Sequence, residues 1–217
     1  MSEVTITVRG EHEERLPAEQ GVVRLTVRVE ASDRGISIER LAAEAGPIRD
    51  ALRTREEAGA LLSWSSSRAT IWTDRPWGPD GTRLNPVHHA SLELTAVFTD
   101  PASLSAWVDE VSLREGAQID SVTWRLSDET ASIARDRVAA AAVRDAVSRA
   151  TAYAAALGHT DVTAVAVADA GLLSPDAPAA APKMMRAAFD AAGSPGVDLR
   201  PDDVAVNAVV EARFTAR

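Results

Sequence analysis

The sequence predicts an α+β fold, a mostly antiparallel sheet with three helices packed on one face, one of them long and rich in alanine. Two patterns support this prediction. Several segments alternate apolar and polar residues, which is typical of strands buried on one side only. Three other segments repeat apolar residues at intervals of three and four, which is typical of helices that bury one stripe. In chain order the expected elements run ββαββαβαββ.

The N-terminal part predicts a pair of strands, at residues 4–8 and 23–29. Both place apolar residues at every second position, and these are Val4, Ile6, Val8, Val23, Leu25, Val27 and Val29. Because side chains alternate between the two faces of a strand, a slip of one residue would expose that whole set. We therefore expect a firm register in this part of the sheet.

Residues 36–58 predict a helix that is interrupted. Its apolar stripe comprises Ile38, Leu41, Ala42, Ala45, Ile48 and Leu52. Gly46 and Pro47 fall within this stripe, and a proline inside a helix costs about 3 kcal/mol, because it removes a hydrogen bond and clashes with the preceding turn. We expect a kink or two short helices, with Pro47 in the first turn of the second.

The middle of the chain predicts a hairpin followed by a second helix. Strands at residues 61–73 and 88–99 flank residues 74–81, which are dense in proline, glycine and aspartate and so favour a loop. Asp100 and Pro101 then suit the cap and the first position of a helix. The buried stripe of that helix is expected to comprise Leu104, Trp107, Val108 and Val111.

A strand at residues 119–126 leads into the long helix at residues 128–158. One stripe of this helix is small and apolar, and it comprises Ala140, Val143, Val147, Ala150, Ala154 and Leu157. So smooth a stripe predicts that the helix lies flat on a sheet or on a partner. Strands follow at residues 162–168 and 204–214, and residues 170–202 between them, rich in proline and alanine, predict a loop.

The composition is that of an ordinary globular protein, and we expect one domain over residues 1–217. Because the net charge is -9 and the pI is near 5.0, we expect no binding to nucleic acid, which requires clustered Lys and Arg. The chain contains no cysteine, which excludes disulfides and thiolate metal sites. It shows neither a membrane span nor a secretory signal. We therefore expect a cytoplasmic protein.

No residue pattern predicts catalysis, a metal or a cofactor. His88 and His89 are adjacent on a strand and so point to opposite faces, which prevents them from chelating one ion. The serines at residues 65–67 lack the glycine context of a nucleophile elbow. The carboxylates within residues 11–14 are typical of a solvated edge, since acid-base catalysis needs a buried pair with separated pKa values. We predict that the protein is not an enzyme and holds no cofactor or metal.

The chain contains five tryptophans against one tyrosine and three phenylalanines. Trp64, Trp107 and Trp124 occur where core residues are expected. Trp77 instead lies in the loop predicted at residues 74–81, where little chain is available to bury it. We consider two roles for Trp77: it anchors a subunit contact, since tryptophan is enriched at interface hot spots, or it folds back over its own strand ends.

Several of these segments together resemble the SIMPL-domain family. The alternating residues 4–10 and 23–27, and the run from Gly116 to Asp128 that leads into the long helix, are similar to that family's pattern. The small residues of the long helix and the closing strand at residues 204–214 are similar as well. The resemblance covers nearly the whole chain, and its motifs are structural.

The resemblance implies a mixed sheet-and-helix fold, a tendency to form oligomers and no catalytic residues. Bacterial relatives are associated with the cell envelope and with tolerance of oxidative stress, and animal relatives act as adaptors in kinase signalling. The N-terminal residues predict no signal peptide, and in this expectation the chain departs from the bacterial pattern.

Two functional hypotheses follow. The first is a non-catalytic, cytoplasmic, bacterial SIMPL-type protein that forms homo-oligomers, acts as a scaffold or interaction module for a protein partner, and is linked to stress tolerance. The second is a binding protein for a small apolar or amphiphilic molecule, held between the sheet and residues 170–202, where Met184 and Phe189 would line the opening. These two residues and Trp77 are the candidate interface residues.

Overall fold

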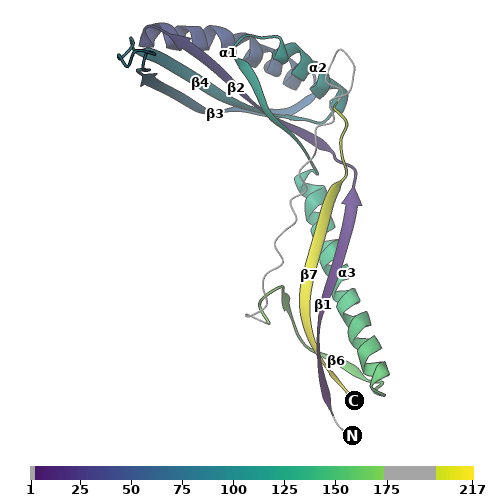
Figure 1. The fold of residues 1–217 in the computed structure, drawn as a ribbon. Coiled ribbons are helices and arrows are strands. Elements are labelled where there is room, and N and C mark those ends of the chain that lie inside the picture. Colours follow the sequence, from purple (N-terminus) through teal and green to yellow (C-terminus); the bar gives the residue numbers. More distant parts are fainter. Residues whose placement is uncertain (1–2, 174–198) are drawn as a thin grey trace. The chain divides into compact units, whose positions relative to one another are not determined.

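The computed structural model describes residues 3–173 and 199–217, and within them it confirms the α+β class and the predicted order of elements (Figure 1). The strands form two antiparallel sheets, whereas a single sheet is expected from the sequence. The elements are β1 (Val4–Leu16), β2 (Gln20–Ala31), α1 (Arg34–Glu57), β3 (Leu61–Asp74), β4 (Val87–Phe98), α2 (Pro101–Ser112), β5 (Ala117–Arg125), α3 (Asp128–Ala156), β6 (Val162–Asp169) and β7 (Val204–Ala216).

The described residues fold into two compact units. The four-stranded unit is built from residues 17–125 with residues 199–202, and the three-stranded unit from residues 3–16, 126–173 and 203–217. Each unit has one of the two sheets and a hydrophobic core of its own. The expectation of one domain over the whole chain stays a prediction.

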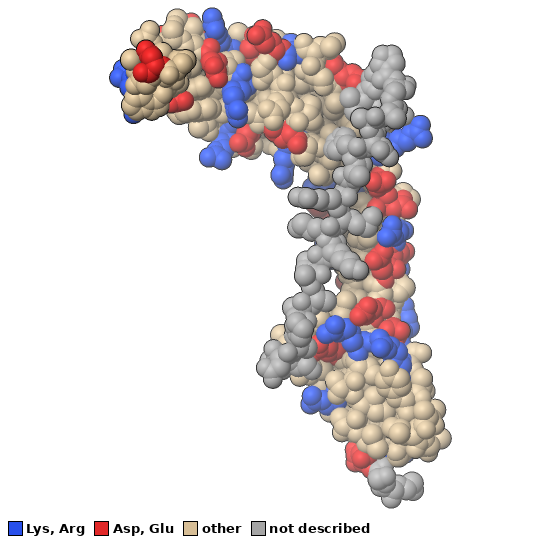
Figure 2. Space-filling model, viewed as in Figure 1, with Lys and Arg blue, Asp and Glu red and all other residues tan. Residues whose placement is uncertain are grey.

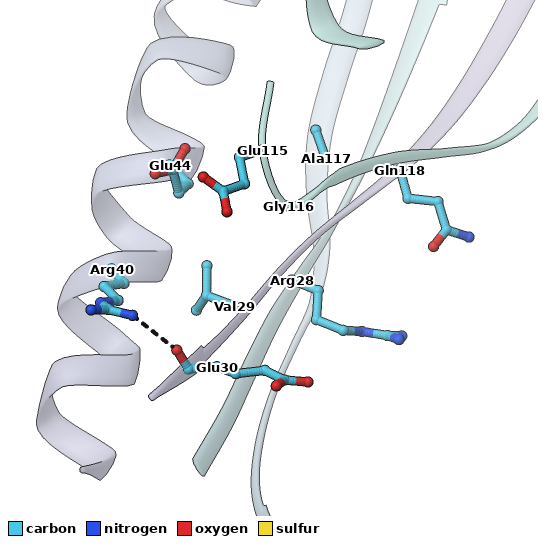
Figure 3. A pocket seen from close by; sticks show the side chains of 9 residues that line it. All are labelled: Arg28, Val29, Glu30, Arg40, Glu44, Glu115, Gly116, Ala117 and Gln118. Atoms are coloured by element: carbon cyan, nitrogen blue, oxygen red, sulfur yellow. Dashed lines mark hydrogen bonds between the residues drawn. The ribbon is translucent and has the colours of Figure 1, made fainter. Parts of the chain in front are cut away.

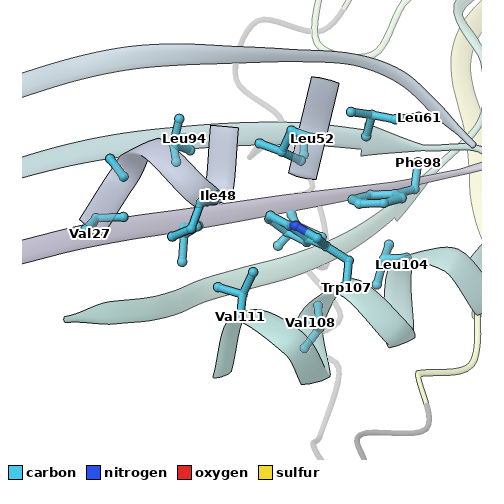
Figure 4. Packing of buried hydrophobic residues seen from close by; sticks show 14 of the residues in the cluster. Val27, Ile48, Leu52, Leu61, Leu94, Phe98, Leu104, Trp107, Val108 and Val111 are labelled. Carbon is cyan, nitrogen blue, oxygen red and sulfur yellow. The ribbon is translucent and has the colours of Figure 1, made fainter. Parts of the chain in front are cut away.

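The four-stranded unit is a sheet in the order β3-β4-β2-β5 with α1 and α2 packed on one face. Its core surrounds one aromatic pair, Phe98 and Trp107, whose ring centroids lie 5.4 Å apart (Figure 4). The predicted stripe of α2 is confirmed, because all four of its residues are buried. Trp64 and Trp124 are half-buried against the same core, as predicted.

Helix α1 runs unbroken over its 24 residues, so the expectation of two short helices is wrong. Pro47 lies on the exposed side of the helix, where water can hydrate the carbonyl of Ala43 that the proline leaves without a partner. Ala45, Ile48 and Leu52, which flank the proline in sequence, are buried against the sheet. Burial of an Ile or Leu side chain contributes about 1.5–3 kcal/mol, so the packed face outweighs the local cost of the proline.

The three-stranded unit is a sheet in the order β1-β7-β6 with α3 packed on one face. β1 pairs with β7 over its whole length, with Gly10 opposite Val210. The core consists of Ile6, Val8, Ala142, Ala146, Ala150, Ala154, Val210, Ala212, Phe214 and Ala216. Even-numbered residues of β1 and β7 therefore face the helix, and the helix contributes only alanines to this core.

The buried stripe of α3 differs from the predicted one. The buried residues recur at every fourth position and are Ala134, Val138, Ala142, Ala146, Ala150 and Ala154. Of the residues expected there, Ala140 is exposed, and Val147 and Leu157 are 43% and 60% exposed. The prediction is confirmed at Ala150 and Ala154, but it includes the exposed Val147 and Leu157, whereas the observed stripe is built mainly of alanines.

The smallest residues are buried because α3 lies almost in contact with the backbone of β1. A Cβ atom on Gly10 would overlap the carbonyl oxygen of Ala142, and it would lie 2.8 Å from the Cβ of Ala146. A larger side chain on either element would hold the helix away from the strand. The larger apolar side chains of α3 therefore flank this contact instead of filling it.

Replacing Gly10 with alanine should destabilise the protein by about 1–3 kcal/mol, because the added methyl group overlaps backbone atoms of α3. The matched control is Gly46→Ala in α1, where an added Cβ meets nothing within 4 Å apart from its chain neighbours and the backbone of its own helix. That substitution should change the stability by less than about 1 kcal/mol, because the lower conformational freedom of alanine is offset by contact of its Cβ with the ring of Pro47. Urea unfolding followed by circular dichroism measures both changes, and a Gly10→Ala variant as stable as the wild type would contradict the close approach.

Candidate functional site

A cleft of about 770 Å³ lies in the four-stranded unit, between α1, the end of β2 and the start of β5 (Figure 3). It is lined by Arg28, Val29, Glu30, Arg40, Glu44, Glu115, Gly116, Ala117 and Gln118. The lining is thus mainly charged and polar, with only two apolar side chains. This cleft is unlike the apolar pocket that the second hypothesis expects.

Two backbone contacts shape the cleft. The N–H of Arg28 donates a hydrogen bond to the carbonyl of Gly116 at 2.8 Å. Gly116 has a φ of +74°, and a Cβ there would lie 2.5 Å from the carbonyl oxygen of Arg28, so glycine is required. On the opposite side, Nη1 of Arg40 donates to the carbonyl of Glu30 at 3.2 Å, which joins α1 to the end of β2 (Figure 3).

The cleft presents charges of both signs. Glu115 extends toward α1, which carries Arg40 and Glu44, whereas the side chain of Arg28 extends away from that helix (Figure 3). Such a lining suits a polar or zwitterionic group, and its ionisable side chains are carboxylates and guanidinium groups. Among the described residues, no group of three or more His, Asp or Glu side chains could hold a metal ion. That the protein takes no metal or cofactor stays a prediction.

The two adjacent histidines of β4 have separate partners. Nδ1 of His88 lies 2.9 Å from Oγ1 of Thr73. The ring of His89 stacks on Trp72, with the centroids 4.8 Å apart, and its Nδ1 lies 3.2 Å from the carboxylate of Glu30. Sequence reasoning misses this stack, because it depends on the register that places Trp72 opposite His89 across β3 and β4.

The loop that carries Trp77 is a compact, hydrogen-bonded turn. The N–H of Gly78 donates to the carbonyl of Thr82 at 2.8 Å. The carboxylate of Asp80 accepts hydrogen bonds from both the backbone N–H and the hydroxyl of Thr82, at 3.2 and 2.7 Å. Trp77 and Arg83 pair as an isolated bridge across the turn. The loop is therefore held in a defined conformation by its own polar groups.

This loop presents the indole of Trp77 to solvent. Trp77 is 63% exposed, and the guanidinium carbon of Arg83 lies 4.1 Å from its ring centroid, a cation–π contact. Most of the indole surface is thus available to a partner. The other two candidate interface residues, Met184 and Phe189, lie outside the described residues.

In the three-stranded unit, side chains of α3 cover the free edge of β1. Nη1 of Arg149 donates to the carbonyl of Arg9 at 2.7 Å, and the N–H of Glu11 donates to the carboxylate of Asp145 at 3.0 Å. These are backbone groups that an edge strand offers to another strand. The helix therefore occupies the edge that β1 would otherwise present.

The carboxylates expected to be a solvated edge are partly engaged. Glu14 accepts two hydrogen bonds from Arg137 of α3, at 2.7 and 2.6 Å. Glu13 pairs with Arg15 on the same strand at 3.1 Å. The sequence does not predict the pair of Glu14 and Arg137, because the apolar periodicity indicates a different face of α3 as the one that packs on the sheet.

One carboxylate on the sheet face opposite α3 is buried. Glu211 is 4% exposed, and it accepts hydrogen bonds from Nη2 of Arg9 at 3.3 Å and from the N–H of Leu173 at 3.2 Å. A hydrogen bond from the backbone of Gly171 is the main cause that lowers the pKa of Glu211, and Arg9 and Leu173 lower it further, while burial acts in the opposite direction. Glu211 thus ties the turn after β6 to the sheet.

Apolar side chains remain uncovered on the three-stranded unit. The exposed ones are Ile133, Val147, Tyr153, Leu157, Val165, Val167 and Leu172. Figure 2 shows a tan surface where α3 ends, and residues 150–158 contain no Lys, Arg, Asp or Glu. Exposed apolar surface of this kind is typical of sites that meet a partner.

The chain matches one family model over nearly its whole length. The model, described as SIMPL, protein of unknown function (DUF541), matches residues 6–214. Comparison with curated proteins returns no significant match. No helix in residues 3–173 or 199–217 is long and apolar enough to cross a membrane.

Glu211 should make folding stability depend on pH. Its pKa is lowered in the folded state, so its ionised form stabilises the fold above its ordinary value of 4.5. This contribution is lost as the pH falls through 4.5 and then through the lower folded pKa. The variant Glu211→Gln should be less stable than wild type at pH 7, and the difference should shrink as the pH falls below 4.5, as measured by urea unfolding. Parallel pH profiles would contradict the assignment.

Removing the carboxylate of Asp145 should expose the edge of β1. Because the hydrogen bond from the Glu11 N–H to this charged group is lost, amide exchange at Glu11 should accelerate about tenfold or more in Asp145→Ala. Hydrogen exchange measured by NMR tests this. Asp136→Ala, which removes an exposed carboxylate from the same helix, is the control and should leave the exchange rate at Glu11 unchanged.

Proposed function

Because the chain belongs to the SIMPL family, we propose that it is a non-catalytic interaction protein that associates with copies of itself and serves as a scaffold for a protein partner. A link to stress tolerance, implied by the resemblance to bacterial relatives, is part of this proposal. The cytoplasmic location expected from the sequence stays a prediction, as does the alternative of a small apolar ligand.

The exposed indole of Trp77 carries the proposal. It is 63% exposed, and the loop around it is fixed by hydrogen bonds among Gly78, Asp80 and Thr82. Tryptophan and arginine are enriched among the residues that contribute most to binding at interfaces, and Arg83 lies against the indole. Since the loop is already ordered, a partner that covers Trp77 would not have to supply the entropy of ordering it.

The uncovered apolar side chains of the three-stranded unit support the same proposal. Val165, Val167 and Leu172 are each at least half exposed, and they follow one another closely along the chain. The cleft beside α1 also supports a binding role, because it presents carboxylates and guanidinium groups that suit charged or polar groups of a partner.

Light scattering coupled to size-exclusion chromatography tests the proposal over a range of protein concentrations. The wild type should show a mass above that of the monomer. Trp77→Ala should raise the concentration at which half of the protein is associated by about 30-fold, the effect expected of a hot-spot residue.

Leu113→Ala is the matched control, because Leu113 is also apolar and is 89% exposed. This control should leave the association unchanged. A wild-type protein that remains monomeric at every concentration would refute the proposal, and equal effects of the two substitutions would remove Trp77 from it.

A further inference from the structure

We propose that the free edge of β6 is a self-association surface, on which β6 of a second copy pairs antiparallel to form a continuous sheet across two molecules. This inference rests on the proposed function, since it names a contact, in addition to the one at Trp77, through which copies associate. It is carried by the difference between the two edges of the three-stranded sheet.

The first edge, β1, is covered by α3 at Arg9 and Glu11. Arg149 and Asp145 of α3 bind the carbonyl of Arg9 and the N–H of Glu11, so a further strand would have to displace them. The order β1-β7-β6 leaves β6 as the other edge of this sheet. The helix packs on β1 and β7, so it offers β6 no comparable cover.

The ladder shows which backbone groups of β6 face outward. The backbone C=O of Arg9 and the backbone N–H of Glu11 point away from β7, so the even-numbered residues of β1 are the ones whose backbone groups bond to β7. Their partners on β7 are also even-numbered, which leaves the backbone groups of the odd-numbered β7 residues to bond to β6. The mutual hydrogen bonds of Asp161 and Arg217, at 3.0 and 3.2 Å, agree with this alternation. The β6 partners of even-numbered β7 residues therefore face outward, and these are Val162, Ala164, Val167 and Asp169. The N–H and C=O groups of the first three have no partner within the described part of the chain.

The side chains of this strand favour pairing with a neutral, apolar neighbour. Residues 162–168 contain only valine, alanine and one threonine, without a proline or a charge. Charges and prolines are the usual means by which edge strands resist pairing. Val165 and Val167 are 58% and 50% exposed, so a neighbouring strand would cover apolar surface as well as satisfy backbone groups.

The edges of the four-stranded sheet are less suited to this role. A bulge does not distinguish the edges, because β3 carries one near Arg68 and β6 carries one at Val165. The side chains do distinguish them: β3 carries a run of exposed serines, and β5 carries Asp120 and Gln118. A partner strand would have to desolvate these polar side chains.

A second copy of β6 fits the open edge of its counterpart. In an antiparallel pair of identical strands with Ala164 of one copy opposite Val167 of the other, Asp169 of each copy lies opposite Val162 of the other. Like charges are therefore not opposed, and the two-fold symmetry closes the contact as a dimer. The sheet would grow from three strands to six.

Disulfide cross-linking tests this pairing directly, because the chain contains no cysteine of its own. Single cysteines are placed in turn at each position from 163 to 168 of the full-length protein, and covalent dimer is measured after mild oxidation. Residues opposed across a two-fold axis lie about 4.5–5.5 Å apart between Cα atoms, within the range that a disulfide spans. The yield should peak at one position, or at two neighbours, and fall on both sides.

Thr7→Cys on the partly covered β1 edge is the matched control and should give little covalent dimer. Adding Val167→Pro should abolish the peak and raise the concentration for half-association about tenfold, because proline removes an outward N–H. Circular dichroism verifies that this variant is folded, and Val167→Lys, which adds a charge at the edge, should give the same loss.

The outcomes separate the two proposals. A wild-type protein that is monomeric by light scattering refutes self-association itself. An associated wild type whose cysteine variants give no peak, or give no more dimer than Thr7→Cys, refutes pairing at β6 and leaves self-association standing.

Discussion

The close approach of α3 to the backbone of β1 is the contact on which the three-stranded unit depends. Gly10 has no room for a side chain, and Ala142 and Ala146 lie directly above it. With so little side-chain volume between them, the helix and the strand bring their flanking polar groups within hydrogen-bond distance. Arg149 and Asp145 reach the edge of β1 for this reason, and Arg137 reaches Glu14. One steric constraint thus determines which residues form the core of the unit and which backbone groups at the edge of β1 the helix covers.

The same constraint explains why this unit is unevenly covered. A helix drawn tightly onto β1 and β7 leaves β6 and the flank of α3 that carries Val147 exposed. The four-stranded unit differs, because two helices cover its sheet and a large aromatic pair fills its core. Uncovered apolar surface in the first unit and an ordered, exposed indole in the second are the features that favour a role in association. The polar cleft beside α1 adds a surface for charged groups.

Much of the fold could be predicted from the sequence, because strands such as β2 and the stripe of α2 bury large residues at regular intervals. The stripe of α3 could not be predicted correctly, since almost every position in residues 139–158 is small and several faces appear equally apolar. The decisive residue, Gly10, lies on another element. The unbroken α1 depends on tertiary packing of Ile48 and Leu52, which outweighs Pro47. Glu211 has the spacing of an exposed residue and is buried only because the turn at residues 171–173 folds over it.

The aromatic residues are distributed unequally between the two units. All five tryptophans, including the buried Trp107, belong to residues 17–125, and the single tyrosine, Tyr153, belongs to α3. Excitation at the long-wavelength edge of the protein's absorption spectrum excites tryptophan alone, so that fluorescence originates from the four-stranded unit. Tyrosine fluorescence originates from the three-stranded unit. The molecule carries a separate optical reporter in each half, and these reporters distinguish sequential from concerted melting without any added dye.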